Sequence, residues 1–176
     1  MLNCHVGTFT VDISPPVGHP LYGGLMDPVR GQDDPLEAVG VVILGNGAPV
    51  VLCALDWCEI RNEAYLKWRQ ALADAAHTTP ERVFVHTVHQ HNAPIADIDA
   101  EKIIQKNNAS SSLDFKYFEK CLAKTAEALK NCQAYSGVPN TANSCYSFAS
   151  TTACGEDSGP KLSHSFNNIS VSNRSV

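Results

Sequence analysis

A strand, a helix and a second strand follow one another between residues 50 and 88, and this order constrains the fold more than any other feature. Val50–Trp57 is apolar at nearly every position, as in a central strand covered on both faces. Residues 63–76 carry apolar side chains at helical spacing, and Asn62 precedes them as a candidate N-cap. A β-branched and aromatic run follows from Val83. The order predicts a right-handed βαβ unit with two parallel strands.

The flanking segments extend this unit into one α/β domain. Val6–Ile13 and Ala38–Leu44 read as strands, and Asn46-Gly47 predicts a hairpin turn because it supplies positive φ angles. A further helix is expected over residues 112–130, where Asp114 suits its start. We therefore expect a mixed sheet that contains the βαβ unit and has helices packed on it.

The last quarter of the chain differs in composition from the rest. Residues 133–176 are rich in Ser, Asn and Thr and show no sustained apolar periodicity. The sequence thus predicts an α/β domain over residues 1–132, followed by a disordered or irregular tail over 133–176.

Composition excludes some functions and compartments. The net charge of -5 argues against a nucleic-acid-binding face, and no apolar run is long enough for a transmembrane segment. The first residues, Met1–Gly7, lack the basic and apolar regions of a signal peptide, so a cytoplasmic location is expected. Seven cysteines without a CxxC pair favour reduced, mostly buried thiols over a disulfide framework.

The predicted strand that begins at Val83 carries three histidines toward its end. His89 and His91 are two residues apart and would share one face of an extended strand, whereas His86 would point the other way. We expect His86 to be packed and hydrogen-bonded rather than to bind a metal. Asp56 ends the neighbouring strand, and ligands gather at the carboxyl ends of parallel strands. The sequence therefore predicts that Asp56 lies near the His89/His91 pair.

Paired imidazoles on one face supply half of a zinc site, because a catalytic zinc usually has three protein ligands and a water. Further candidate ligands, none at a diagnostic spacing, are Asp56, His5, His19, Asp34 and His164. On spacing alone, buried or surface histidines that bind no metal are slightly favoured over a metal site. The Gly- and Pro-rich loop over residues 14–35 also has two readings, a plain surface loop or the rim of an active site. Its glycines do not match a phosphate-binding motif.

Several ordered motifs carry a resemblance to a known family. They are Val6-Gly7-Thr8 with Asp12-Ile13-Ser14-Pro15-Pro16-Val17-Gly18, then Asp34-Pro35-Leu36-Glu37-Ala38, and finally Thr79-Pro80-Glu81-Arg82-Val83 leading to His89-Gln90-His91-Asn92-Ala93-Pro94. Together they resemble the N-terminal domain of the neutral/alkaline non-lysosomal ceramidases. That resemblance implies a zinc-dependent hydrolase of sphingolipid metabolism that cleaves the amide of ceramide.

The resemblance also implies roles for single residues. His89 corresponds to a zinc ligand, and His91 to the immediate shell of the site, where it is a candidate metal ligand and catalytic residue. Asp56 is a candidate catalytic residue that orients His89, or alternatively a cap of the following helix. Gln90, Asn92 and Ala93 depart from the family's His-Thr-His-Ser-Gly-Pro signature and leave the substrate open, a small-molecule or lipid amide.

The family's other zinc ligands and its nucleophile lie further along than the resemblance extends, which is to about Leu129. We therefore expect a truncated or frame-shifted copy of the catalytic domain that is inactive alone. Translation of the other reading frames beyond Cys132 tests this expectation. The resemblance also implies that relatives are often secreted or membrane-associated. The alternative is a non-catalytic α/β fragment or binding module without a metal.

Overall fold

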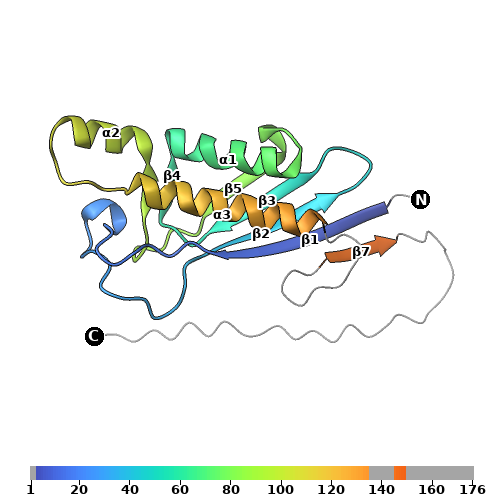
Figure 1. Cartoon of the computed structure of the whole chain (residues 1–176), viewed down its shortest axis with the longest axis horizontal. Helices are drawn as coiled ribbons and strands as arrows, with labels where there is room; N and C mark the ends of the chain where they lie inside the picture. The colour runs from blue at the N-terminus through green and yellow to red at the C-terminus, as the bar shows by residue number, and fades with distance from the viewer. Residues whose placement is uncertain (1–2, 135–144, 150–176) are drawn as a thin grey trace.

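Five strands form one mixed sheet in the order β5-β3-β2-β1-β7, in a computed structural model that describes residues 3–134 and 145–149 (Figure 1). The elements are β1 (Asn3–Asp12), a 3₁₀ turn η1 (Tyr22–Gly24), β2 (Glu37–Leu44), β3 (Val50–Leu55), β4 (Glu59–Arg61), α1 (Asn62–Ala76), a 3₁₀ turn η2 (Pro80–Arg82), β5 (Val83–Thr87), β6 (Ile95–Asp97), α2 (Ile98–Lys106), α3 (Phe115–Ala134) and β7 (Cys145–Ala149). β3 and β5 are parallel and the other pairs in this sheet are antiparallel. The predicted α/β class, mixed sheet and βαβ unit are confirmed.

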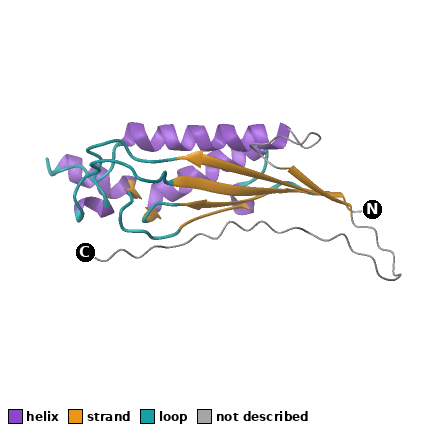
Figure 2. Cartoon of the chain, turned by 90° about the horizontal axis from the view of Figure 1, so that it is seen from below, coloured by secondary structure: helices purple, strands orange, loops and turns teal. Residues whose placement is uncertain are grey.

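Helices α1 and α3 lie on the same face of the sheet (Figure 2). The core between them contains Phe9, Trp57, Trp68 and Phe118, each at most 1% exposed. The indole rings of Trp57 and Trp68 meet edge to face, with centroids 5.7 Å apart. These aromatic side chains supply much of the apolar area whose burial stabilises the fold.

The opposite face of the sheet carries no helix of the described chain (Figure 2). Side chains that alternate with the core positions are exposed there, including Val39, Leu52 and Phe84 at 44%, 43% and 56%. The prediction that residues 50–57 form a strand covered on both faces is therefore wrong. Its apolar pattern is real, but the described helices cover one face only.

The start of α1 also differs from the prediction. Arg61 is the N-cap residue and makes no side-chain capping bond, whereas Asn62 has φ +48° and donates to Asp97 Oδ2 at 3.0 Å. The Glu63 amide donates instead to Asp99 Oδ2 at 3.1 Å. The cap of α1 is thus supplied across space by the segment that begins α2, and the prediction of Asn62 as the cap is wrong.

The connections between elements were predicted less well than the elements. The β2–β3 hairpin is confirmed, but neither Asn46 nor Gly47 has a positive φ, so its turn is not the predicted type. Helix α2 was not predicted. α3 begins at Phe115 rather than at about residue 112, and Asp114 Oδ1 accepts the Lys116 amide at 2.8 Å at this start.

Part of the predicted tail belongs to the sheet. Residues 133 and 134 complete α3, and β7 pairs antiparallel with β1 from Asn3↔Ala149 to Gly7↔Cys145. The rest of the segment 133–176 lies outside the described residues. None of the described helices combines the length and the apolar character needed to cross a membrane.

Candidate metal centre

The histidine segment lies at the end of the sheet where β3 and β5 finish. Leu55 pairs with Thr87 at this end, and Ala38 at the start of β2 pairs with Leu55. The loops over residues 13–36, 56–58 and 88–94 therefore leave the sheet at the same end, as expected for the ligand-binding edge of a parallel βαβ unit.

Backbone hydrogen bonds fix the 88–94 loop against its neighbours. The amides of Val88 and His89 donate to Leu55 O and Trp57 O at 3.1 and 3.3 Å. Farther along, Tyr22 N donates to Ala93 O and Cys58 N donates to Pro94 O. Because these bonds join the loop to two separate segments, residues 55–58 and Tyr22, they hold it in one arrangement.

The two site histidines do not belong to a strand. β5 ends at Thr87, and His89 has a left-handed backbone with φ +62°, which a non-glycine residue adopts only when its surroundings hold it there. Their rings are nevertheless neighbours, with centroids 5.3 Å apart and planes at 83°. The predicted strand alternation is thus wrong for His89 and His91, although the structure brings their rings together.

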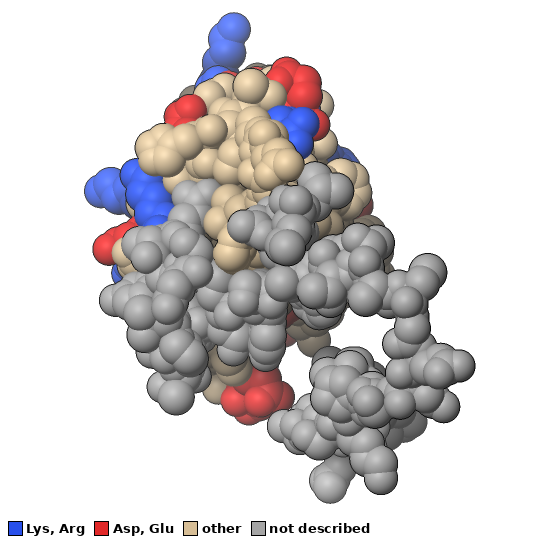
Figure 3. Space-filling view, turned by 90° about the vertical axis from the view of Figure 1, so that its right-hand side faces the viewer, with Lys and Arg blue, Asp and Glu red and all other residues tan. Residues whose placement is uncertain are grey.

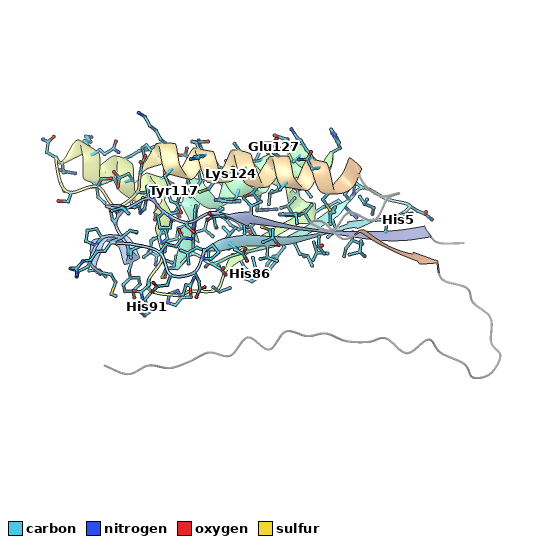
Figure 4. All side chains as sticks on the ribbon, turned by 60° about the horizontal axis from the view of Figure 1, so that its bottom comes forward. His5, His86, His91, Tyr117, Lys124 and Glu127 are labelled. Carbon is cyan, nitrogen blue, oxygen red and sulfur yellow. The ribbon has the colours of Figure 1, made fainter. Side chains whose placement is uncertain are left out.

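His91 is supported by the long loop that precedes β2. Its ring stacks on Tyr22, with centroids 4.5 Å apart and planes 14° apart. Figure 4 shows His91 at the loop-bearing end of the sheet, with His5 at the other end. The 14–35 loop thus contacts His91 through Tyr22.

Asp56 lies in the same region, but its hydrogen bonds join it to residues other than the two histidines. Its Oδ2 accepts the Glu37 amide at 2.9 Å, and its amide donates to Glu37 O at 2.9 Å. Its backbone carbonyl accepts the Gln90 side chain at 2.7 Å. The carboxylate therefore joins β3 to β2 rather than capping α1, and the atom beside the His89 ring is Cys58 O.

His89 belongs to a cluster of three potential metal ligands, together with Cys58 and Glu59. His89 Nδ1 lies 3.7 Å from Cys58 Sγ and 3.6 Å from Glu59 Oε1, and one donor atom from each residue lies within 4.8 Å of the other two. Cys58 is fully buried, whereas the side chains of Glu59 and His89 are 21% and 54% exposed. Thiolate, imidazole and carboxylate are together a donor set that suits zinc.

The electrostatics of the cluster depend on two charged neighbours. Burial raises the pKa of the Cys58 thiol, the Glu59 carboxylate raises it further, and the Arg61 cation opposes both effects. Arg61 pairs with Glu59 Oε2, so Oε1 is the carboxylate oxygen turned toward His89.

Two of the other candidate ligands lie elsewhere. His19 is 3% exposed, its Nδ1 lies 2.7 Å from Pro20 O and its Nε2 accepts the Asp114 amide at 3.4 Å. Burial lowers its pKa, so the neutral ring is favoured as a structural link between the loop and α3. His5 lies on β1 far from His91 (Figure 4), and His164 lies outside the described residues.

His86 projects from the open face of the sheet, away from α3 (Figure 4). It is exposed, contacts Phe84 with ring centroids 5.6 Å apart, and its Nδ1 lies 3.4 Å from Thr87 O. It belongs to no metal-ligand cluster among residues 3–134. The prediction that it points away from a metal site agrees with this position, but its expected close packing is wrong.

The 14–35 loop encloses a cleft of about 430 Å³ at the same end of the molecule. Asp34 lines this cleft, as do Gln90 and Asn92, which alternate with the two histidines. His89 and His91 do not line it. The loop therefore lines a cleft next to the histidine segment, and its role as the rim of an active site stays a prediction.

Charge is mixed on the surface at the other end of the molecule. Figure 3 shows basic and acidic side chains next to one another on the described part of that face, without a patch of one sign.

Sequence reasoning missed Cys58 and Glu59. Both follow β3 by only a few residues, at the carboxyl edge that singled out Asp56. A search of the whole strand-to-helix connection for metal ligands would have included them.

Comparison with known proteins gives a match in structure only. No family model matches the chain, and no curated protein matches it. A crystal structure of neutral ceramidase from Pseudomonas aeruginosa matches with a TM-score of 0.56 and 19% identity, over 76% of this chain and 22% of that chain. A structure described as ceramidase complexed with C2 matches with a TM-score of 0.54 and 18% identity, over the same shares. The chain thus spans about 22% of the length of these solved structures, and its fold is ceramidase-like.

Proposed function

We propose that this chain is part of a zinc-dependent amide hydrolase of the neutral ceramidase type, and that its active centre needs residues beyond those described. The observation that carries the proposal is the meeting of His89 and His91, with rings 5.3 Å apart, at the carboxyl end of β5. The ceramidase-like fold supports it. His89 is the proposed zinc ligand, and His91 is a second ligand or a neighbour that contacts the substrate.

The donors around His89 fit zinc, since they offer nitrogen, sulfur and oxygen within reach of one ion. A zinc ion bound there would supply Lewis-acid polarisation of an amide carbonyl. The stacking of His91 on Tyr22 would hold the His91 imidazole where it can donate or accept a proton. Asp56 enters as a positioning residue, because it links β2 and β3 and its carbonyl holds Gln90 in the loop.

A lipid amide suits the surroundings of the site. Leu25 is 79% exposed and Met26 is 41% exposed on the 14–35 loop, and Val88 is 51% exposed beside the histidines. An apolar rim of this kind lowers the free energy of a bound acyl chain by removing it from water. The proposed substrate is therefore a lipid N-acyl amide of the ceramide class.

The experiment is a measurement of metal content and amide hydrolysis on the purified chain. We expect up to one zinc per chain by elemental analysis, loss of that zinc in His89→Ala, and little or no hydrolysis of a fluorescent ceramide. His86→Ala is the control and should retain the wild-type zinc content, because His86 lies on the open sheet face.

Absence of zinc from the wild-type chain after incubation with the metal would favour the alternative, a non-catalytic α/β module. Turnover of the fluorescent ceramide by this chain, lost in His89→Ala, would support the hydrolase and contradict its dependence on additional residues.

A further inference from the structure

We infer that Cys58, Glu59 and His89 form a thiolate-containing site for a divalent metal of the zinc class, with His89 Nδ1 as its central ligand. The inference rests on the proposed function for the identity of the metal, but it assigns the ion a particular place and ligand set. The site uses the Nδ1 side of the His89 ring, whereas a site shared by His89 and His91 would not require Cys58 or Glu59.

The distances between the donor atoms support this ligand set. A tetrahedral zinc with ordinary Zn–S, Zn–N and Zn–O lengths separates its ligand atoms by roughly 3.4 to 3.6 Å. His89 Nδ1 lies 3.7 Å from Cys58 Sγ and 3.6 Å from Glu59 Oε1. Two edges of the tetrahedron therefore have nearly the required length before a metal enters.

The backbone around the three residues is fixed. Cys58 N donates to Pro94 O at 3.0 Å, and Cys58 O accepts the Thr87 hydroxyl at 3.0 Å. The parallel pairing of β4 with β6 begins at Glu59↔Ile95. A hydrogen bond from the His89 amide to Trp57 O holds His89 in its left-handed conformation, with φ +62°. A preorganised ligand set of this kind loses little conformational entropy when the ion binds.

A simpler interpretation is an ion pair between His89 and Glu59 with no metal. That interpretation explains the carboxylate, which already pairs with Arg61, but it gives no role to a fully buried thiol 3.7 Å from the same ring nitrogen. His89 Nδ1 also lies 3.2 Å from Cys58 O, within hydrogen-bond distance. A neutral ring with its proton on Nδ1 donates to this carbonyl, whereas metal binding at Nδ1 requires the tautomer that carries the proton on Nε2. The Cys58 thiol releases its proton to solvent when it binds the metal as a thiolate.

Three protein ligands leave a fourth position of a tetrahedral site for water or substrate, which is the arrangement of catalytic rather than structural zinc. The exposure of His89 and Glu59, against the burial of Cys58, places this position on the solvent side of the cluster. The described part of the chain would then offer a metal with an open coordination position.

Cobalt(II) titration of the purified full chain under reducing conditions tests the site. We expect one Co²⁺ per chain, visible bands of tetrahedral cobalt, near-ultraviolet thiolate-to-cobalt charge-transfer absorption, and displacement of cobalt by Zn²⁺. Cys58→Ser and His89→Ala should abolish the charge-transfer band. Glu59→Gln should weaken binding by about tenfold or more, because loss of a group that only orients a ligand already has an effect of that size and Glu59 is a ligand.

Matched controls separate this site from other thiols and imidazoles. Cys121→Ser removes a buried thiol that lies 4.0 Å from Ile13 O, and His86→Ala removes an exposed imidazole; both should leave the band unchanged. His91→Ala should also retain it, because His91 is not a ligand in this set.

The outcomes distinguish this inference from the proposed function. If zinc binds, its binding is lost in His91→Ala, and the cobalt-substituted protein shows no thiolate charge-transfer band, the thiolate site is overturned and the hydrolase proposal stays intact. No metal binding at all would overturn both. Circular dichroism shows which variants fold; if Cys58→Ser does not, a band that is absent from the wild type or persists in His89→Ala still overturns the site.

Discussion

At the scale of single residues, Glu101 is a carboxylate buried inside the described part of the chain. Its carboxylate is fully buried and accepts hydrogen bonds from the amides of Ser112 and Leu113 and from the side chains of Gln105, Ser111 and Ser112. A buried charge persists only when such donors replace its water. Glu101 thereby fixes the connection between α2 and α3, although it has no place in the metal centre.

We predict that Glu101→Gln lowers the free energy of unfolding by about 2 kcal/mol, because an amide cannot accept all the bonds that the carboxylate accepts. Urea denaturation followed by circular dichroism measures the change. The matched control is Glu127→Gln on the exposed side of α3, which should change stability little. Equal effects of the two substitutions would contradict a structural role for the buried carboxylate.

The Glu101 prediction also has a pH dependence. Burial alone would raise the pKa of Glu101, but its hydrogen bonds, led by the Ser112 amide, outweigh burial and hold the pKa below its ordinary value of 4.5. A carboxyl whose pKa is lower in the folded state stabilises the fold above its unfolded pKa and loses that effect as pH falls through the folded value. The stability difference between wild type and Glu101→Gln should therefore be constant near neutral pH and shrink below about pH 4.5. A difference that stays constant under acid conditions would contradict it.

At the scale of elements, the strands and the two long helices could be predicted because each carries a periodic apolar pattern. Helix α2 could not, since its fully buried inward position is Glu101 and a charged side chain does not mark an inward face. The predicted cap of α1 failed for a related reason, because Asp99 caps it from a distant segment. Cys58 and Glu59 follow β3 closely enough to be candidates, but their approach to His89 could not be predicted, because no local pattern predicts the left-handed backbone of His89.

The cap of α1 gives a prediction at this scale. Asp99→Ala should reduce the free energy of unfolding by about 1 kcal/mol, since the Glu63 amide loses its acceptor. Thermal denaturation of both proteins measures the loss. Asp33→Ala, at an exposed loop position, is the control and should leave the melting temperature nearly unchanged. A similar shift in both variants would show that Asp99 contributes charge rather than a cap.

The contact of β1 with β2 gives another prediction. A Cβ atom at Gly40 would lie 1.9 Å from Phe9 Cζ, so the aromatic ring occupies the space that a side chain at residue 40 would fill. Gly40→Ala should cost about 2 to 3 kcal/mol of stability, because the buried Phe9 ring must shift. Gly47→Ala is the control, since its new methyl group meets nothing within 4 Å. Denaturant midpoints that coincide for the two variants would contradict the tight packing of Phe9.

At the scale of the whole molecule, the described chain is a two-layer arrangement with helices on one side of the sheet (Figure 2). The β3 pattern predicts burial on both faces, but the open face leaves Leu52 and Phe84 in contact with water. A sequence pattern records what a strand can bury and does not specify which segment covers it. The same distinction applies to the metal centre, where the sequence indicates ligands and the fold decides which of them meet.

The open face leads to the last prediction, which concerns the surface rather than the core. The double variant Leu52→Thr with Phe84→Thr should bind less of the dye anilinonaphthalene sulfonate, because it removes the two large apolar side chains that lie opposite each other on β3 and β5. Threonine retains a β-branched side chain, so the free energy of unfolding should change by less than about 0.5 kcal/mol. Leu66→Gln is the control, since Leu66 is 60% exposed on α1, away from the sheet. If dye fluorescence fell in the control and not in the double variant, the apolar surface would lie on the helices; a large loss of stability in the double variant would mean that another part of the chain covers this face.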